Sequence, residues 1–268
     1  MSESGPRLAN AFLRYSTAFN RFCNIPTLGS LFQLTNSAVV GNDSLLWVQI
    51  EHGPAAGLWI SLNPRTGKSV LLGEGEPRVQ QALAEYLRPQ MVFYDLGANI
   101  GFFSLLASRL VGAEGHVFSF EPDPILFLRL RQNLEHNGFR QAVAEERAVW
   151  NKSATLPFTC ADTSQSPDRA LGHLSLEPTE PPNTTQVACV SLDDYCTSHP
   201  APDFIRCDVQ GAECEVFQGA TNTLRQWHPI IVCEMHSMEN HFALTRFFLD
   251  FGYTCYALGV NYVLAVLA

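Results

Sequence analysis

The chain has 268 residues, enough to bury a core in one α/β domain with an N-terminal addition. Apolar residues make up 46% of it and charged residues 16%, a balance that excludes bulk disorder. The net charge of −9 opposes binding to phosphate backbones, so we expect no nucleic-acid partner.

The N-terminal segment mixes aromatic residues with arginines, and we expect it to form an extension over residues 1–73. One or two short helices are expected before residue 40, followed by strand-like runs at 45–50 and 58–62. No secretory leader and no run of roughly 20 apolar residues is found, which indicates a cytoplasmic protein without membrane contact. The eight cysteines form no CxxC pair, so we expect reduced thiols and no structural zinc site.

Residues 74–268 are expected to form one domain, which begins with a helix opened by Pro77 and ended by Pro89. Strands and helices then alternate, as in a doubly wound, Rossmann-like sandwich with a mostly parallel sheet. The expected strands span 91–96, 116–120, 142–150, 187–192, 204–209 and 230–235, and the expected helices span 100–111, 125–137, 213–225 and 239–251. Runs at 253–258 and 262–266 predict a closing antiparallel hairpin.

Residues 151–186 interrupt this alternation. The segment is polar and rich in proline, and we expect an insertion in surface loops with a hairpin at 154–159. Long insertions in α/β enzymes often carry substrate contacts. The insertion and the N-terminal extension are therefore the expected walls of an acceptor pocket.

A glycine-containing loop follows the first strand of the sheet, where ligands of such folds bind. Asp95 ends the strand, Gly97 and Gly101 allow a tight turn, and Asn99 lies between them, with Phe102 directly after. A dinucleotide usually requires GxGxxG, and a carboxylate at this place would repel its pyrophosphate. S-adenosylmethionine carries an ammonium and a sulfonium, which an acid attracts. The loop therefore predicts the methyl donor.

A second acid supports the binding of an adenosine group. Glu121 ends the second strand, the twentieth residue after Gly101, and Pro122 follows it. A carboxylate at this point can accept both ribose hydroxyls. We expect the cofactor to contact Asp95, Gly97, Asn99, Gly101, Phe102, Glu121, Pro122 and Asp208.

Five ordered motifs resemble the FkbM family of methyltransferases. They are the loop Asp95-Leu96-Gly97-Ala98-Asn99-Ile100-Gly101, the acid motif Phe120-Glu121-Pro122-Asp123-Pro124, the short Leu192-Asp193-Asp194, the strand and turn Ile205-Arg206-Cys207-Asp208-Val209-Gln210-Gly211-Ala212-Glu213, and the strand end Ile231-Val232-Cys233-Glu234. The resemblance implies a class I methyltransferase fold and O-methylation of a hydroxyl on a sugar or secondary metabolite. Arg206 replaces the usual lysine of this family and cannot act as a base, and Gln210 replaces a frequent glutamate.

Transfer of a methyl group to a hydroxyl requires alignment of the reactants and removal of a proton. Asp208 ends the fourth main strand and is the first candidate for this role, and Glu234 and His236 are the next candidates. The same three side chains could bind a divalent cation, although no metal site is assigned. Glu213 is expected to interact with the dipole of its helix rather than to take part in the chemistry.

Two other functions remain open from the sequence. One is a noncatalytic protein that binds S-adenosylmethionine, because of the departures at Arg206 and Gln210. The other is a nicotinamide-dependent oxidoreductase, which the missing third glycine disfavours. The preferred reading is an S-adenosylmethionine-dependent methyltransferase for a small polar substrate that bears a hydroxyl, and the oligomeric state is not predicted.

Overall fold

A computed structural model describes residues 45–160, 172–174 and 184–268, which fall into two compact units. The described part of the smaller unit is 45–75, and that of the larger unit is 76–160, 172–174 and 184–268. The helices expected before residue 40 lie outside the described residues. All cysteines within the described ranges are free, in line with the expected reduced thiols.

The smaller unit contains an antiparallel pair of strands, β1 (Leu46–Gln49) and β2 (Trp59–Leu62), and a short helix, α3 (Lys68–Leu71). The two strand-like runs expected from the sequence are thus confirmed. Val48 pairs with Ile60, and both side chains are buried. The turn before α3 is held by the side chain of Asn63, whose Oδ1 accepts the backbone N–H of Arg65 at 2.9 Å.

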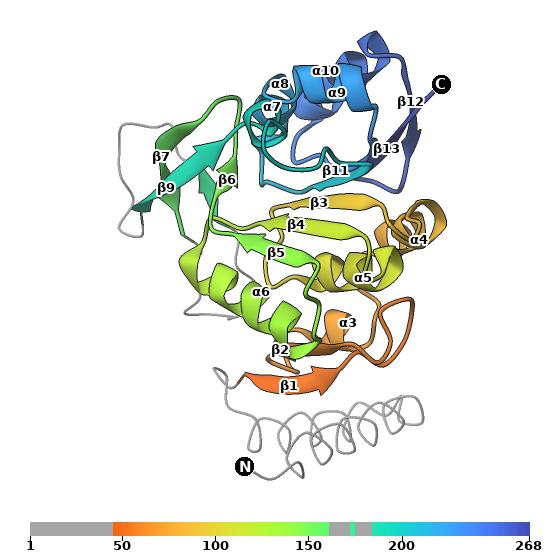
Figure 1. Cartoon of the computed structure of the whole chain (residues 1–268), viewed down its shortest axis with the longest axis vertical. Coiled ribbons are helices and arrows are strands. Elements are labelled where there is room, and N and C mark those ends of the chain that lie inside the picture. The colour runs from red at the N-terminus through yellow and green to blue at the C-terminus, as the bar shows by residue number, and fades with distance from the viewer. Residues whose placement is uncertain (1–44, 161–171, 175–183) are drawn as a thin grey trace, which may run out of the picture. The chain divides into compact units, whose positions relative to one another are not determined.

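The larger unit is built on a seven-stranded sheet with the order β12-β13-β11-β10-β3-β4-β5 (Figure 1). Its strands are β3 (Val92–Leu96), β4 (His116–Phe120), β5 (Ala142–Glu145), β10 (Phe204–Cys207), β11 (Ile230–Glu234), β12 (Tyr253–Ala257) and β13 (Tyr262–Leu267). Strands β3, β4, β5, β10 and β11 are parallel, and β13 is antiparallel to β11 and to β12. The expected class I methyltransferase sandwich with its closing antiparallel hairpin is confirmed.

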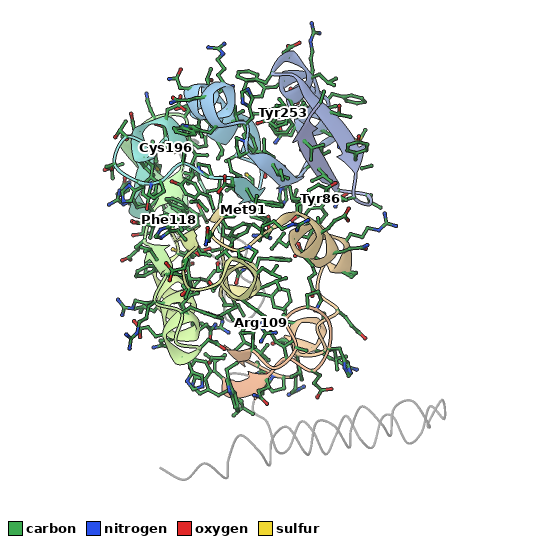
Figure 2. The ribbon with its side chains drawn as sticks, turned by 45° about the vertical axis from the view of Figure 1, so that its right-hand side comes forward. Tyr86, Met91, Arg109, Phe118, Cys196 and Tyr253 are labelled. Carbon is green, nitrogen blue, oxygen red and sulfur yellow. The ribbon has the colours of Figure 1, made fainter. Side chains whose placement is uncertain are left out.

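Helices cover both faces of this sheet. Figure 1 shows α4 (Pro77–Tyr86), α5 (Phe102–Val111) and α6 (Pro124–His136) on one face. The other face carries α7 (Leu192–Tyr195), α8 (Glu213–Gln218), α9 (Thr221–Trp227) and α10 (Met238–Asp250). Side chains of alternate strand residues form the main core beneath α7–α10, which includes Phe118 and Tyr253, both labelled in Figure 2.

A second, four-stranded sheet has the order β6-β9-β7-β8, with β6 (Ala148–Val149), β7 (Ala154–Thr159), β8 (His173–Leu174) and β9 (Thr184–Val190). It corrects two expectations. The strand expected over 142–150 divides into β5 and β6, which belong to different sheets. The hairpin expected over 154–159 is the single strand β7, because that segment has no Gly, Asn or Asp for a two-residue hairpin turn.

Two further expected boundaries are wrong. The helix expected over 213–225 breaks into α8 and α9 at Gly219, where a Cβ atom would lie 2.5 Å from the carbonyl oxygen of Trp150. The strand expected over 187–192 starts earlier and ends earlier, because Leu192 opens α7. The hydroxyl of Ser191 caps this helix by accepting the backbone N–H of Asp194 at 3.1 Å.

Candidate active site

The loop after β3 joins three strand ends. Gly97 has φ +78°, and a Cβ atom there would lie 1.9 Å from the backbone oxygen of Asp208, so only glycine fits. The N–H groups of Gly97 and Ala98 donate to the carbonyl of Phe120, at 3.0 and 2.9 Å. The ends of β3, β4 and β10 are thereby packed together around one loop.

Glu121 is fixed by two backbone donors. Its Oε2 accepts the N–H of Asn99 at 2.8 Å, and its Oε1 accepts the N–H of Asp123 at 2.9 Å. The residue is only 5% exposed, and burial raises the pKa of its carboxyl to about 8. Asn99 has φ +52°, an unusual conformation for a residue with a side chain, which directs its N–H toward the carboxylate.

An open cavity lies beside this carboxylate, with about 590 Å³ of empty space including its mouth. Five of the residues expected to contact the cofactor line it: Gly97, Asn99, Glu121, Pro122 and Asp208. The apolar part of the wall comes from Phe120, Leu126, Val149, Phe158 and Leu174. Three of these belong to β6, β7 and β8, whose contribution could not be predicted from the loop motifs.

Asp95, Gly101 and Phe102, which are also expected to contact the cofactor, are not among the residues that line this cavity. Asp95 is completely buried on the α5 side of the sheet, where Ser104 Oγ donates to its Oδ2 at 2.6 Å. Burial raises its pKa, and Arg206 acts in the opposite direction. Gly101 starts α5 with φ +90°, and Phe102 packs against Phe103, so both have structural places in the described fold.

Arg206 links Asp95 to the cavity. Its Nη1 lies 3.2 Å from Asp95 Oδ1 and donates to the carbonyl of Gly97 at 3.1 Å. Its Nη2 donates to Asp208 Oδ2 at 2.7 Å, and its guanidinium lies 4.6 Å from the ring centroid of Phe103. Although burial opposes its charge, the neighbouring carboxylates raise the pKa of Arg206 well above its ordinary value. A role as a base is therefore excluded.

The three candidate catalytic residues lie together, and we call Asp208, Glu234 and His236 the acid–imidazole cluster. One donor atom of each lies within 4.8 Å of the other two. His236 Nε2 is 3.5 Å from Asp208 Oδ1 and 3.9 Å from Glu234 Oε2. Burial and the charge of Asp208 raise the pKa of Glu234 to about 7. Oxygen and imidazole donors in this arrangement suit a proton acceptor or a divalent cation.

The structure adds two side chains that the sequence analysis did not name, Glu76 and Tyr262, and it places Glu213 beside His236. The hydroxyl of Tyr262 lies 2.6 Å from Glu76 Oε2 and 2.9 Å from Glu234 Oε2. Glu213 is fully buried, and its Oε1 lies 2.7 Å from His236 Nδ1. Burial alone would raise its pKa, but the bond to His236 and the N–H of Gly211 hold the pKa below its ordinary value. No local pattern predicts these contacts, because α8 looks like an ordinary helix with an acid in its first turn.

Comparison with known proteins gives one sequence relative with a named substrate. Hexuronic acid methyltransferase AglP of Haloferax volcanii is 29% identical over 175 residues, which cover 61% of this chain and 63% of that protein. The chain therefore spans less than two thirds of the length of this relative.

Among the described residues, none of the helices has the length and apolar character needed to cross a bilayer.

Similar solved structures include the FkbM methyltransferase of Methylobacillus flagellatus, with 16% identity and a TM-score of 0.48 over 75% of this chain and 54% of that one. A precorrin-6y C5,15-methyltransferase from Geobacter metallireducens has 17% identity and a TM-score of 0.45, over 74% and 90%. Similarity at this level gives no basis for assigning an activity. The profile of the Methyltransferase FkbM domain matches residues 95–255, more than half of the sequence, and the chain therefore belongs to the FkbM methyltransferase family.

Proposed function

We propose that this chain is an S-adenosylmethionine-dependent methyltransferase whose cofactor binds in the cavity beside Glu121. The observation that carries the proposal is the Glu121 carboxylate, which two backbone N–H groups hold at the cavity wall. A carboxylate at the end of the second strand of such a sheet suits the two hydroxyls of a ribose. The membership of the FkbM family gives this geometry its chemical context.

The remaining walls suit the other parts of the cofactor. The apolar side chains of Leu126, Val149 and Phe158 suit an adenine ring, and Asp208 offers negative charge to a cationic methionine end. Asp95 acts indirectly here, because it is buried and holds Arg206. When bound, the cofactor supplies an activated methyl group on a sulfonium, which needs no further activation by the protein.

We propose further that the acceptor is a hydroxyl of a sugar or a related small polar molecule. This rests on the relative that acts on a hexuronic acid, and on the acid–imidazole cluster beside Asp208. As the acceptor oxygen bonds to the methyl carbon, the carbon–sulfur bond breaks and its electron pair stays on sulfur. The hydroxyl proton passes to His236 Nε2, which faces the carboxylates of Asp208 and Glu234.

Calorimetric titration with S-adenosylmethionine and with its demethylated product tests the cofactor site. We expect Glu121→Gln to weaken binding by about 10-fold to 100-fold, because an amide cannot accept the two ribose hydroxyls through two oxygens as a carboxylate can. Glu135→Gln, which alters an exposed side chain on α6, is the matched control and should bind normally. Equal binding by all three proteins, or none by the wild type, would exclude this site.

A panel of sugars and small alcohols with isotope-labelled methyl donor then separates an enzyme from a noncatalytic binder. Transfer that is lost in His236→Gln, with unchanged cofactor binding, supports the enzyme. Cofactor binding without transfer to any acceptor in the panel would favour the noncatalytic alternative. A nicotinamide-dependent oxidoreductase is tested by NADH in the same calorimeter, and we expect no binding because the loop lacks the third glycine.

A divalent cation is a second candidate ligand of the acid–imidazole cluster, since its three donor atoms lie within 4.8 Å of one another. Two carboxylates and an imidazole suit Mn²⁺ or Mg²⁺, which would polarise the acceptor hydroxyl. Titration with Mn²⁺ followed by electron paramagnetic resonance tests this directly. Binding that disappears in Glu234→Gln supports the cation site, and absence of binding in the wild type excludes it.

A further inference from the structure

Glu213 is a buried carboxylate to which the proposed function gives no part. It begins α8, yet its side chain is completely shielded from solvent. Its Oε1 accepts the N–H of Gly211 at 2.9 Å, and its Oε2 accepts the side-chain amide of Asn240 at 2.9 Å. An acid that only balanced a helix dipole would remain at the surface. The Glu213 carboxylate instead accepts these two hydrogen bonds, and its Oε1 also lies against His236.

The chain around Glu213 is shaped to bring it under the cluster. Gln210 and Gly211 have φ values of +57° and +105°, so the backbone turns sharply between β10 and α8. Asn240 lies in the first turn of α10, where its N–H is capped by Ser237 Oγ at 3.0 Å. The amide of Asn240 also donates to the carbonyl of Gly211 at 3.1 Å. The turn at Gly211 and the first turn of α10 therefore fix the position of the Glu213 carboxylate.

The same contacts decide which nitrogen of His236 faces the acceptor side. Nδ1 lies 2.7 Å from Glu213 Oε1, whereas Nε2 lies 3.5 Å from the nearest oxygen of Asp208. An ionised carboxylate has no proton to donate, so the hydrogen between Glu213 and His236 belongs to Nδ1. In the neutral ring the lone pair must then be on Nε2, which points into the acid–imidazole cluster.

We propose that Glu213 is a positioning residue that holds His236 with its proton on Nδ1 and its Nε2 lone pair toward the acceptor. What Nε2 does there rests on the proposed function, but the orientation does not. A free imidazole prefers the proton on Nε2. In that form Nε2 would donate a hydrogen bond to Asp208 or Glu234, and it could not accept the proton of the hydroxyl. The buried carboxylate reverses this preference, in the same way that carboxylates orient catalytic and metal-binding histidines.

The orientation can be measured without an acceptor, by long-range ¹H–¹⁵N spectra of protein labelled at histidine. The His236 signals are assigned as those missing in His236→Gln, and spectra are taken at pH 10 to neutralise the ring. We expect the wild type to carry the proton on Nδ1 alone. Glu213→Gln keeps one acceptor oxygen and should retain this form, whereas Glu213→Met, which has no acceptor, should move the proton to Nε2. Glu215→Gln removes a charge from the same helix and should behave as the wild type.

A wild-type ring with its proton on Nε2, or with protons on both nitrogens at pH 10, would overturn the proposal. So would an unchanged spectrum in Glu213→Met. Circular dichroism and chemical denaturation show that each variant is folded. Methyl transfer is a separate readout: no transfer by the wild type would count against the proposed function while leaving the orientation intact. If transfer occurs, we expect Glu213→Met to lower kcat at least 10-fold and leave the affinity for the methyl donor unchanged.

Discussion

The guanidinium of Arg206 lies 3.2 Å from the carboxylate of Asp95, although 111 residues separate them in the sequence. Both side chains are buried, and Asp95 is completely inaccessible to solvent. Asp208 Oδ2 accepts a hydrogen bond from Nη2, the second terminal nitrogen of the same guanidinium, at 2.7 Å. Arg206 thus neutralises charge in the core and at the cavity wall at once, and its removal would leave two carboxylates without their shared partner.

We predict that Arg206→Met destabilises the protein by about 3 kcal/mol or more, since one member of a buried ion pair remains uncompensated. Chemical denaturation followed by circular dichroism measures the effect. Arg131→Met is the control, because Arg131 pairs with Glu135 at the surface and its loss should cost at most about 0.5 kcal/mol. Similar unfolding free energies for the two variants would contradict the prediction that the buried ion pairs of Arg206 stabilise the protein.

The raised pKa of Glu121 predicts how the stability of the protein depends on pH. Its pKa of about 8 in the folded protein lies above the ordinary value of 4.5, so between these values the folded state keeps a proton that the unfolded chain has lost. Its contribution to stability is therefore complete below about pH 4.5 and decreases as the pH rises toward 8. We expect the cofactor-free protein to lose roughly 3 kcal/mol from this group between pH 5 and pH 8.

Glu121→Gln should flatten that dependence, because the amide does not titrate. Denaturant unfolding at several pH values compares the variant with the wild type and with Glu135→Gln. Some slope will remain in Glu121→Gln, since burial also raises the pKa of Asp95. An identical slope in wild type and Glu121→Gln would show that the Glu121 carboxyl titrates normally.

Gly97→Ala tests the close approach of two strand ends. The added Cβ would meet the backbone oxygen of Asp208 at 1.9 Å, so the loop must move and cofactor binding should fall below detection. Gly112→Ala is a matched control, because Gly112 has a similar φ of +72° but open space around it. We expect the control to cost about 1–2 kcal/mol from backbone strain alone and to bind the cofactor normally. Calorimetry and denaturant unfolding of both variants separate the clash from the backbone strain. Equal effects of the two substitutions on cofactor binding and stability would contradict the clash.

Tyr262→Phe removes the hydroxyl that lies between Glu76 and Glu234. Without it, Glu234 loses a hydrogen bond and becomes free to move, so we expect methyl transfer to slow by about 10-fold. Affinity for the methyl donor should not change, because Tyr262 does not line the cavity. Tyr256→Phe, at an exposed position of β12, is the control for the kinetic assay. A rate equal to that of the wild type would mean that Glu234 needs no such support.

Much of the sheet could be predicted from the sequence because its signals are local. Each buried strand is a short apolar run, and the loop at Gly97 and the acid at Glu121 follow such runs directly. Parallel strands end at one edge, which is why Asp208, Glu234 and His236 could be expected near one another. These predictions needed only residue type, spacing and the rule for ligand sites in such sheets.

The second sheet and the orientation of the Asp95 and Glu213 side chains depend on contacts between distant residues, which no local sequence pattern predicts. Strand β7 pairs with β9, although residues 160–183 lie between the two strands in the sequence. Asp95 is predicted to contact the cofactor, and no local pattern shows that its side chain is buried against Ser104 and Arg206. Glu213 turns inward only because Asn240 and His236 come from a distant helix and strand end. In each case tertiary contacts override the local preference.

The shared guanidinium also has a consequence for how this protein changes over evolutionary time. Asp95 and Asp208 share the single positive charge of Arg206, so a neutral residue at 206 would leave both carboxylates without it. A lysine at 206, the usual residue of this family, would keep the positive charge but has a single nitrogen, so it could not place separate nitrogens on Asp95 and Asp208 as arginine does. Substitution at any of the three positions therefore changes the environment of the other two.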